Sequence, residues 1–167
     1  KRVKVIYNSN NLGVGGAVKV GYIESLNDNF DLIVKMDGDD QMDSGEIEKL
    51  VAPLLEGYDY TKGNRFLNKT EIENYPPVRF YGNIFLSFLS KLSTGYWNIF
   101  DPVNGFTCIK KEIANKINFN EIDNGYFFET DLLFNLNLIK SKVADVPINK
   151  KYFKDKKQNM SIPKETV

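Results

Sequence analysis

The sequence predicts a layered α/β fold. Short apolar runs typical of strands alternate with segments whose apolar residues recur at helical spacing. The chain has 167 residues, a length that suits one domain with a substantial core. We expect residues 1–149 to form this domain and residues 150–167 to be a basic, polar tail.

In the first half of the chain, the apolar runs of residues 3–7 and 30–36 predict two strands. Between them, the apolar residues of segment 13–26 return every three or four positions, which predicts a helix. After the second strand, Asp43 or Ser44 can accept a hydrogen bond from the first backbone N–H groups of another helix. The predicted order is therefore strand, helix, strand, helix.

The second half of the chain continues this alternation. Residues 58–62, 106–109 and 142–146 predict short strands, and residues 127–139 predict a helix. Residues 80–92 carry a stripe of large apolar side chains at helical spacing. Because such a stripe most often faces the core, we expect it to be buried; a helix lying on a membrane surface is the alternative.

The composition excludes several classes of function. With no histidine and one cysteine, the chain has no histidine base, no imidazole metal site and no thiolate zinc cluster. Basic and acidic residues number 22 each, and a zero net charge argues against a nucleic-acid partner held by bulk charge. Any metal must be held by oxygen, which favours Mg²⁺, Mn²⁺ or Ca²⁺. With no signal peptide apparent, we expect a cytoplasmic protein, with the cytoplasmic face of the membrane as a further location.

An acidic turn follows the predicted strand 30–36. Its carboxylates belong to Asp37, Asp39 and Asp40, and so many like charges favour a bound cation. Ligands of open α/β sheets collect at the carboxyl ends of strands, and Gly38 should let the backbone turn sharply there. The alternative is an acidic turn that caps the next helix. A calcium-binding EF-hand is disfavoured, because the sixth loop position lacks glycine.

A glycine-rich turn opens the first predicted helix. Gly13, Gly15 and Gly16 follow a predicted strand, an arrangement that suits an anion at a helix N-terminus. The turn lacks the last glycine of the dinucleotide fingerprint and the Lys-Ser/Thr of a phosphate-binding P-loop. Alone it is a weak signal.

Five motifs follow one another along the chain. They are Asn11-x-Gly13 with Gly16-Ala17 and Gly21, Asp37-x-Asp39, Gly63-Asn64-Arg65, the Asp-Pro-Val-Asn-Gly-Phe of residues 101–106, and the acidic segment 125–131. This ordered set resembles the family 2 glycosyltransferases of the GT-A fold, and most closely the dolichol- and polyprenyl-phosphate sugar transferases. The resemblance implies a mixed, mostly parallel sheet flanked by helices.

The resemblance also implies an activity, namely metal-dependent inverting transfer of a sugar from a nucleotide-sugar donor to an acceptor. Polyprenyl or dolichyl phosphate is the leading acceptor. Asp37 and Asp39 would contact Mg²⁺ or Mn²⁺ beside the donor diphosphate, with Gln41 close to the ion. Arg65 would grip phosphate through two hydrogen bonds, and its alternative is an ordinary ion pair.

The remaining site residues follow from the same resemblance. Asp131 and Glu129 are the candidate bases, with Asp131 favoured; the alternative is a pair of acids that interact with a helix dipole. Four further residues are predicted to bind substrate or an anionic surface, namely Gly13, Arg79, Asn104 and Lys156. For the lysines after residue 150, a solvated tail is the alternative.

The chain departs from the family at its start, because it begins after the strands that usually bind the base and ribose of the donor. We therefore expect an N-terminally truncated fold and an exposed sheet edge that invites pairing with another copy. The alternative to an enzyme is a non-catalytic binding or assembly module, or an inactive fragment.

Overall fold

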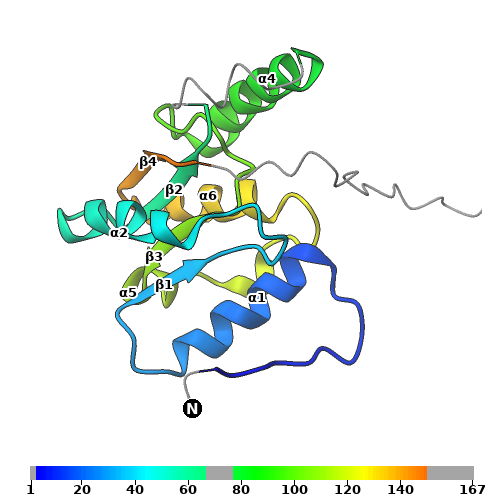
Figure 1. Cartoon of the computed structure of the whole chain (residues 1–167), viewed down its shortest axis with the longest axis vertical. Coiled ribbons are helices and arrows are strands. Elements are labelled where there is room, and N and C mark those ends of the chain that lie inside the picture. The colour runs from blue at the N-terminus through cyan, green and yellow to red at the C-terminus, as the bar shows by residue number, and fades with distance from the viewer. Residues whose placement is uncertain (1–2, 67–76, 150–167) are drawn as a thin grey trace, which may run out of the picture.

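The computed structural model describes residues 3–66 and 77–149, which fold into a mixed α/β arrangement (Figure 1). The strands are β1 (Leu32–Lys35), β2 (Tyr60–Asn64), β3 (Thr107–Lys110) and β4 (Val143–Pro147). The α-helices are α1 (Gly13–Leu26), α2 (Ile47–Leu55), α4 (Pro77–Thr94), α5 (Lys111–Ala114) and α6 (Phe128–Leu138), with 3₁₀ turns η1 (Ser44–Glu46) and η2 (Phe119–Glu121). The predicted strands and helices after residue 12 are confirmed with shifted boundaries.

The four strands form one sheet in the order β1-β3-β2-β4. Strand β3 is antiparallel to both of its neighbours, whereas β2 and β4 pair in parallel. Three strands therefore point the same way and β3 lies reversed between two of them. As a result, the carboxyl ends of β1, β2 and β4 and the residues just before β3 meet at one edge of the sheet.

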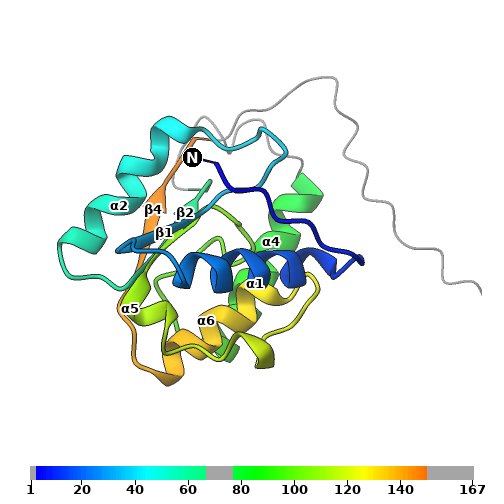
Figure 2. The ribbon, with the colours of Figure 1, turned by 90° about the horizontal axis from the view of Figure 1, so that it is seen from below.

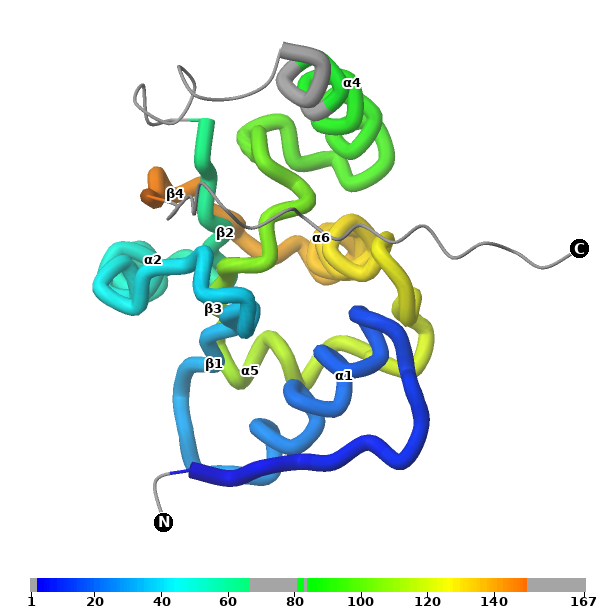
Figure 3. Tube along the Cα trace, turned by 45° about the vertical axis from the view of Figure 1, so that its right-hand side comes forward, coloured from blue at the N-terminus to red at the C-terminus, as the bar shows by residue number. Residues whose placement is uncertain are grey.

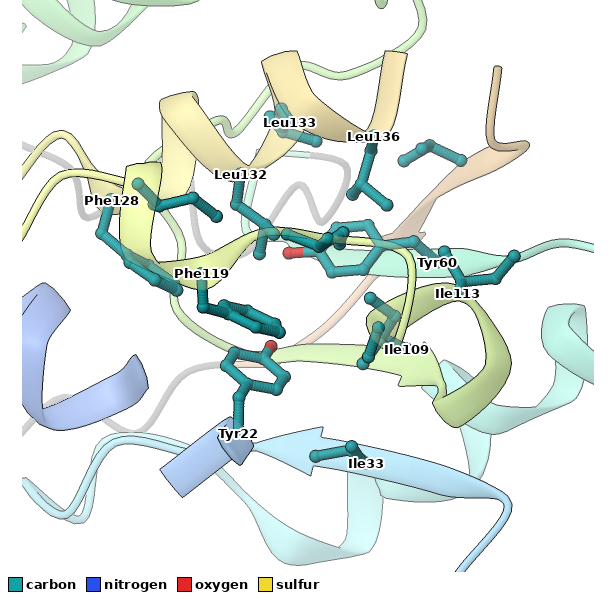
Figure 4. Packing of buried hydrophobic residues seen from close by; sticks show 14 of the residues in the cluster. Tyr22, Ile33, Tyr60, Ile109, Ile113, Phe119, Phe128, Leu132, Leu133 and Leu136 are labelled. Atoms are coloured by element: carbon teal, nitrogen blue, oxygen red, sulfur yellow. The ribbon is translucent and has the colours of Figure 1, made fainter. Parts of the chain in front are cut away.

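Helices cover both faces of the sheet (Figure 2). On one face, α2 packs Leu50 and Leu54 against Phe106, Cys108 and the apolar residues of β4. On the other face, α1, α5 and α6 enclose the larger core (Figure 4). The two cores are possible because side chains alternate along each strand; in β3, Cys108 faces one core and Ile109 the other.

The first turn of α1 packs directly on the loop before α6. The Gly16 N–H donates to the Asn124 carbonyl at 3.0 Å. A Cβ at Gly15 would lie 2.6 Å from the Asp123 carbonyl oxygen and 2.8 Å from the Phe128 Cβ. Gly13 has a φ of 76°, in the left-handed region that favours glycine. These glycines are therefore required for close backbone packing.

The predicted strand at residues 3–7 is wrong. These residues form no strand, and Val3, Val5 and Tyr7 are exposed. A run of apolar residues becomes a strand when a neighbouring backbone supplies hydrogen bonds, and no strand in the described chain pairs with this segment. The pattern of apolar residues does not show whether a neighbouring strand is present to supply those hydrogen bonds.

The prediction that the stripe in residues 80–92 is buried is also wrong. In α4, the side chains that face the protein are small and polar, namely Ser87, Ser90 and Thr94. The large apolar side chains are exposed instead: Tyr81, Ile84, Phe85, Leu86, Phe88, Leu89 and Leu92. Helix α4 packs against α6, which also contacts α1, and Figure 3 shows α4 and α1 at opposite ends of the fold. Within the described residues, no helix is long and apolar enough to cross a membrane.

We predict that Gly15→Ala destabilises the protein, because the new methyl group would meet backbone and Cβ atoms that cannot move aside. The expected loss in free energy of unfolding is about 1–3 kcal/mol, typical of overpacking, and is measured by urea denaturation. Gly21→Ala in the same helix is the control, since nothing lies within 4 Å of its added Cβ. That variant should be neutral or more stable; equal losses for both would contradict the packing role of Gly15.

Candidate functional site

A pocket of about 100 Å³ lies at the sheet edge where the carboxyl ends of β1, β2 and β4 meet. Each of these strands leads directly into residues that line it, and the segment before β3 closes the opposite side. The polar lining consists of Asp37, Asp39, Gln41, Arg65, Asn104 and Asn149. The structure thus brings together five residues that the sequence predicted, from three separate segments, and adds Asn149.

Backbone N–H groups of the acidic turn donate hydrogen bonds to side chains within the turn. The Asp37 N–H donates to the Met42 sulfur at 3.3 Å, and the Gln41 N–H donates to the Asp39 carboxylate at 3.1 Å. The residue of the turn in the left-handed region is Asp40, with a φ of 62°; Gly38, where the sequence predicted a sharp turn, has no positive φ. Aspartate tolerates this conformation far better than a β-branched apolar residue does.

Behind the pocket, a buried carboxylate joins two lysines. Glu129, in the first turn of α6, lies 2.9 Å from the Lys35 ammonium and 2.9 Å from the Lys62 ammonium. Lys62 is 0% exposed and also donates to the Asn104 carbonyl at 2.6 Å. Lys35 donates to the Gly105 carbonyl and, at 3.0 Å, to Asp37. The two lysines therefore connect β1, β2, α6 and the loop before β3.

The charges in this cluster stabilise one another. Burial alone would raise the pKa of Glu129, but Lys62 and Lys35 outweigh it and lower that pKa. Burial alone would lower the pKa of Lys35, but Glu129 and Asp37 outweigh it and raise that pKa. Glu129 is therefore held ionised and paired, which makes it a poor proton acceptor.

Arg65 enters the pocket as one half of an ion pair. Its guanidinium donates two hydrogen bonds to Asp101, of 2.7 and 2.8 Å, and the Asp101 side chain is fully buried. This fork geometry fixes the guanidinium plane at the pocket wall. Arg65 therefore forms an ion pair, the alternative that the sequence offered, and it also lines the pocket; its binding of phosphate stays a prediction.

Asn104 and Asn149 are fixed by neighbouring groups. The Asn104 amide donates to the Gly63 carbonyl at 2.7 Å, and its side-chain oxygen accepts from the Phe106 N–H at 3.2 Å. The Asn149 amide donates to Glu46 at 3.0 Å. Asn104 therefore sets the shape of the loop before β3.

The other predicted site residues lie elsewhere. Asp131 accepts a hydrogen bond from the Asp123 N–H at 2.8 Å, in the first turn of α6. Gly13 lies against the Asn124 carbonyl and does not line the Asp37 pocket. Arg79 is in the first turn of α4 but its side chain is outside the described part, and Lys156 lies outside the described residues.

A second, larger hollow of about 600 Å³ runs between α1 and β1 and ends at Asp37 and Asp39. Its walls are largely apolar, with Val18 and Tyr22 from α1 and Ile33 from β1. The two carboxylates therefore lie where an apolar groove meets a polar pocket. This arrangement suits a ligand with one flat, weakly polar end and one anionic end.

The donor set at Asp37 and Asp39 fits a hydrated divalent cation. Within the described part of the chain, no group of three or more acidic or cysteine side chains could enclose a metal. Two carboxylates beside open space suit an ion that keeps waters and phosphate oxygens as its other ligands, as Mg²⁺ and Mn²⁺ do beside nucleotides.

Sequence reasoning missed Lys35, Lys62 and Asp145. Lys35 and Lys62 stand within otherwise apolar or small runs, and an isolated lysine in a predicted strand was the available signal. Asp145 in β4 accepts hydrogen bonds from the Asn64 side chain and from the Phe100 N–H at 3.2 Å. Its other oxygen is buried without a hydrogen-bond partner among the described residues.

A family model and several known proteins match this chain. The family model described as Glycosyl transferase family 2 matches residues 1–117. An uncharacterized protein of Methanocaldococcus jannaschii is 32% identical over 143 residues, covering 85% of this chain and 58% of that protein. UDP-N-acetylglucosamine--dolichyl-phosphate N-acetylglucosaminyltransferase of Methanococcus voltae is 28% identical over 152 residues, covering 90% of this chain and 60% of that enzyme.

Among solved structures, glucosyl-3-phosphoglycerate synthase from Mycobacterium tuberculosis, in complex with Mn²⁺, UDP and phosphoglyceric acid, has a TM-score of 0.60 at 18% identity. The match covers 90% of this chain and 48% of that one. The predicted GT-A fold is thereby confirmed. The chain spans about three fifths of the length of the two curated relatives above.

We predict that the contribution of Asp145 to the free energy of unfolding decreases as the pH rises. Burial raises the pKa of Asp145 to about 6, so the folded state keeps a proton between about pH 4 and 6 that the unfolded state releases. The contribution of Asp145 is therefore most favourable below pH 4 and is lost as the pH passes 6. Asp145→Asn should gain stability relative to the parent across this window, by up to about 3 kcal/mol.

Urea denaturation at a series of pH values measures this difference. Asp28→Asn, at an exposed aspartate, serves as the control and should run parallel to the parent. A constant offset between Asp145→Asn and the parent from pH 4 to 7 would contradict the prediction.

Proposed function

Because the chain belongs to glycosyl transferase family 2, we propose that it is the catalytic part of an inverting hexosyltransferase. It would move a sugar from a nucleotide-sugar donor to a polyprenyl or dolichyl phosphate. The observation that carries this proposal is the meeting of Asp37, Asp39, Gln41 and Arg65 in one pocket. The relative from Methanococcus voltae, named as acting on dolichyl phosphate, supports the lipid acceptor.

The donor would lie across the two hollows. The apolar groove between α1 and β1 would take the nucleoside, and the polar pocket would take the diphosphate and sugar. Asp37 and Asp39 would hold Mg²⁺ or Mn²⁺, with Gln41 beside it, and the ion would neutralise the diphosphate leaving group. Arg65, oriented by Asp101, would donate to a phosphate oxygen. The neighbour crystallised with Mn²⁺ and UDP supports this arrangement.

The two carboxylates of α6 would have different roles. Glu129 would position Lys35 and Lys62, because it is buried and paired with both. Asp131 would be the base where the acceptor is a hydroxyl that reaches the first turn of α6, beside the pocket that Asp37 lines, since Asp131 is less buried than Glu129 and no lysine pairs with it among the described residues. A phosphate acceptor is already ionised, so there Asp131 would orient the acceptor and take no proton.

Helix α4 supports a membrane surface as the place of action. Its exposed face is apolar over more than two turns, while small polar side chains face the protein. A soluble helix normally has the opposite orientation, and an exposed apolar face of this size marks an interaction site. We propose that this face rests in the headgroup region of the cytoplasmic leaflet, where a lipid phosphate is available.

A non-catalytic assembly module is the second candidate. Strand β1 pairs with β3 on one side, and its other edge pairs with no strand of the described chain. Such an edge can accept a strand from a second copy of the chain. A module of this kind would bind without transferring sugar, so the metal-dependence experiment below separates the two candidates.

We predict that Asp39→Asn abolishes Mn²⁺-dependent transfer. Removing one of two carboxylate ligands should lower transfer at least about a hundredfold, or roughly 3 kcal/mol of transition-state stabilisation. The assay follows transfer of labelled sugar from UDP-sugars to polyprenyl phosphate by the protein that carries this chain. Asp40→Asn is the control, since Asp40 is the neighbouring exposed carboxylate and asparagine tolerates its positive φ. Equal activity of Asp39→Asn and Asp40→Asn would contradict the proposal that Asp39 binds the metal ion.

We predict that Phe85→Glu weakens binding of the 167-residue chain to vesicles of phosphatidylcholine and phosphatidylglycerol. Phe85 is 61% exposed in α4, and placing a charge there should reduce partitioning about tenfold in a vesicle-sedimentation experiment. Leu55→Glu is the matched control, because Leu55 is 78% exposed on α2, across the sheet. Equal effects of both substitutions, or no binding by the parent, would contradict a membrane role for α4.

A further inference from the structure

The Lys35 ammonium contacts three oxygen-bearing groups at once. It lies 2.9 Å from Glu129, 3.0 Å from Asp37 and 3.1 Å from the Gly105 carbonyl. Asp37 is one of the two aspartates to which the proposed function assigns the divalent ion. We propose that Lys35 is an internal counter-cation, which occupies Asp37 and weakens binding of a divalent ion to the free protein. This inference rests on the proposed metal site.

Lys35 cannot easily move away from Asp37. Its side chain is 10% exposed, and Glu129, itself held by Lys62, fixes the ammonium from behind. Space is equally restricted on the loop side, because a Cβ at Gly105 would collide with the Lys35 ammonium and lie 2.5 Å from an Asp37 oxygen. An ion that binds Asp37 therefore has to share the carboxylate with a positive charge whose position is fixed.

Two opposing effects decide what removal of Lys35 does. Repulsion between the ammonium and a divalent ion roughly 5 Å away should weaken ion binding at least about tenfold, even at the dielectric constant of water. In the other direction, Lys35 restrains the Asp37 side chain, and losing that restraint should weaken binding by about twofold. Repulsion is the larger effect, so removing the charge should tighten ion binding.

The balance of charges at the site explains why the ion and a diphosphate should bind together. Lys35 and Lys62 carry two positive charges, and Glu129, Asp37 and Asp39 carry three negative charges, so the ion site has a net charge of −1 before any ligand binds, which a divalent ion would change to +1. A divalent ion alone would leave an excess of positive charge there. A diphosphate supplies the missing negative charge, so the ion and the diphosphate should bind more tightly together than either does alone.

The experiment is a titration of the 167-residue chain with Mn²⁺, in which free Mn²⁺ is measured by electron paramagnetic resonance without any donor. Lys35→Met should bind Mn²⁺ at least about fivefold more tightly than the parent. Lys62→Met is the matched control: each variant leaves Glu129 paired with one lysine, but Lys62 does not contact Asp37. It should change the affinity less than about twofold, and Lys35→Arg, which keeps the charge, should bind as weakly as the parent.

The outcomes separate this inference from the proposed function. If the parent binds Mn²⁺ and Asp39→Asn does not, the metal site stands, and unchanged or weaker binding by Lys35→Met would overturn the role of Lys35 alone. Absence of binding in the parent and in Lys35→Met would overturn both. Thermal denaturation checks that each variant is folded, and Lys35→Gln, which retains a polar group, replaces Lys35→Met if that variant is not.

Discussion

The buried carboxylate of Glu129 is the interaction on which the site depends. A charge removed from water is costly unless opposite charges and hydrogen bonds accompany it, so Glu129 requires both Lys35 and Lys62. Each lysine then uses a remaining donor to hold a carbonyl of the loop before β3. One buried negative charge thereby fixes two strands, a helix and a loop at the edge where the predicted ligands gather.

The sequence predicted most elements, because their apolar periodicity is set by contacts on both faces of the sheet. It also predicted that Asp37, Asp39, Gln41, Arg65 and Asn104 belong to one site, and the structure brings these five together. What it could not predict is which partners each group finds. The pairing of Glu129 with two lysines depends on positions 67 and 94 residues apart in the chain, which no local pattern encodes.

Helix α4 shows that the spacing of apolar residues can predict a helix without predicting which of its faces is buried. The spacing of its large apolar residues correctly predicted a helix, but spacing does not say which face meets the protein. The orientation follows from the small polar stripe, since Ser87, Ser90 and Thr94 allow close packing on α6. Helix α4 is therefore attached through its smaller side chains, and its larger ones remain available for another surface.

The strand order has a consequence for how the chain folds. Strand β1 pairs with β3, whose residues lie some 75 positions later, and β2 pairs in parallel with β4, about 83 positions later. Pairings this distant in sequence close slowly, because a long loop must be ordered before any strand contact forms. Among the strands of the described residues, β1 gains a sheet neighbour only once β3 has left the ribosome. The segment between β1 and β3 therefore spends that time without this pairing, exposed to aggregation.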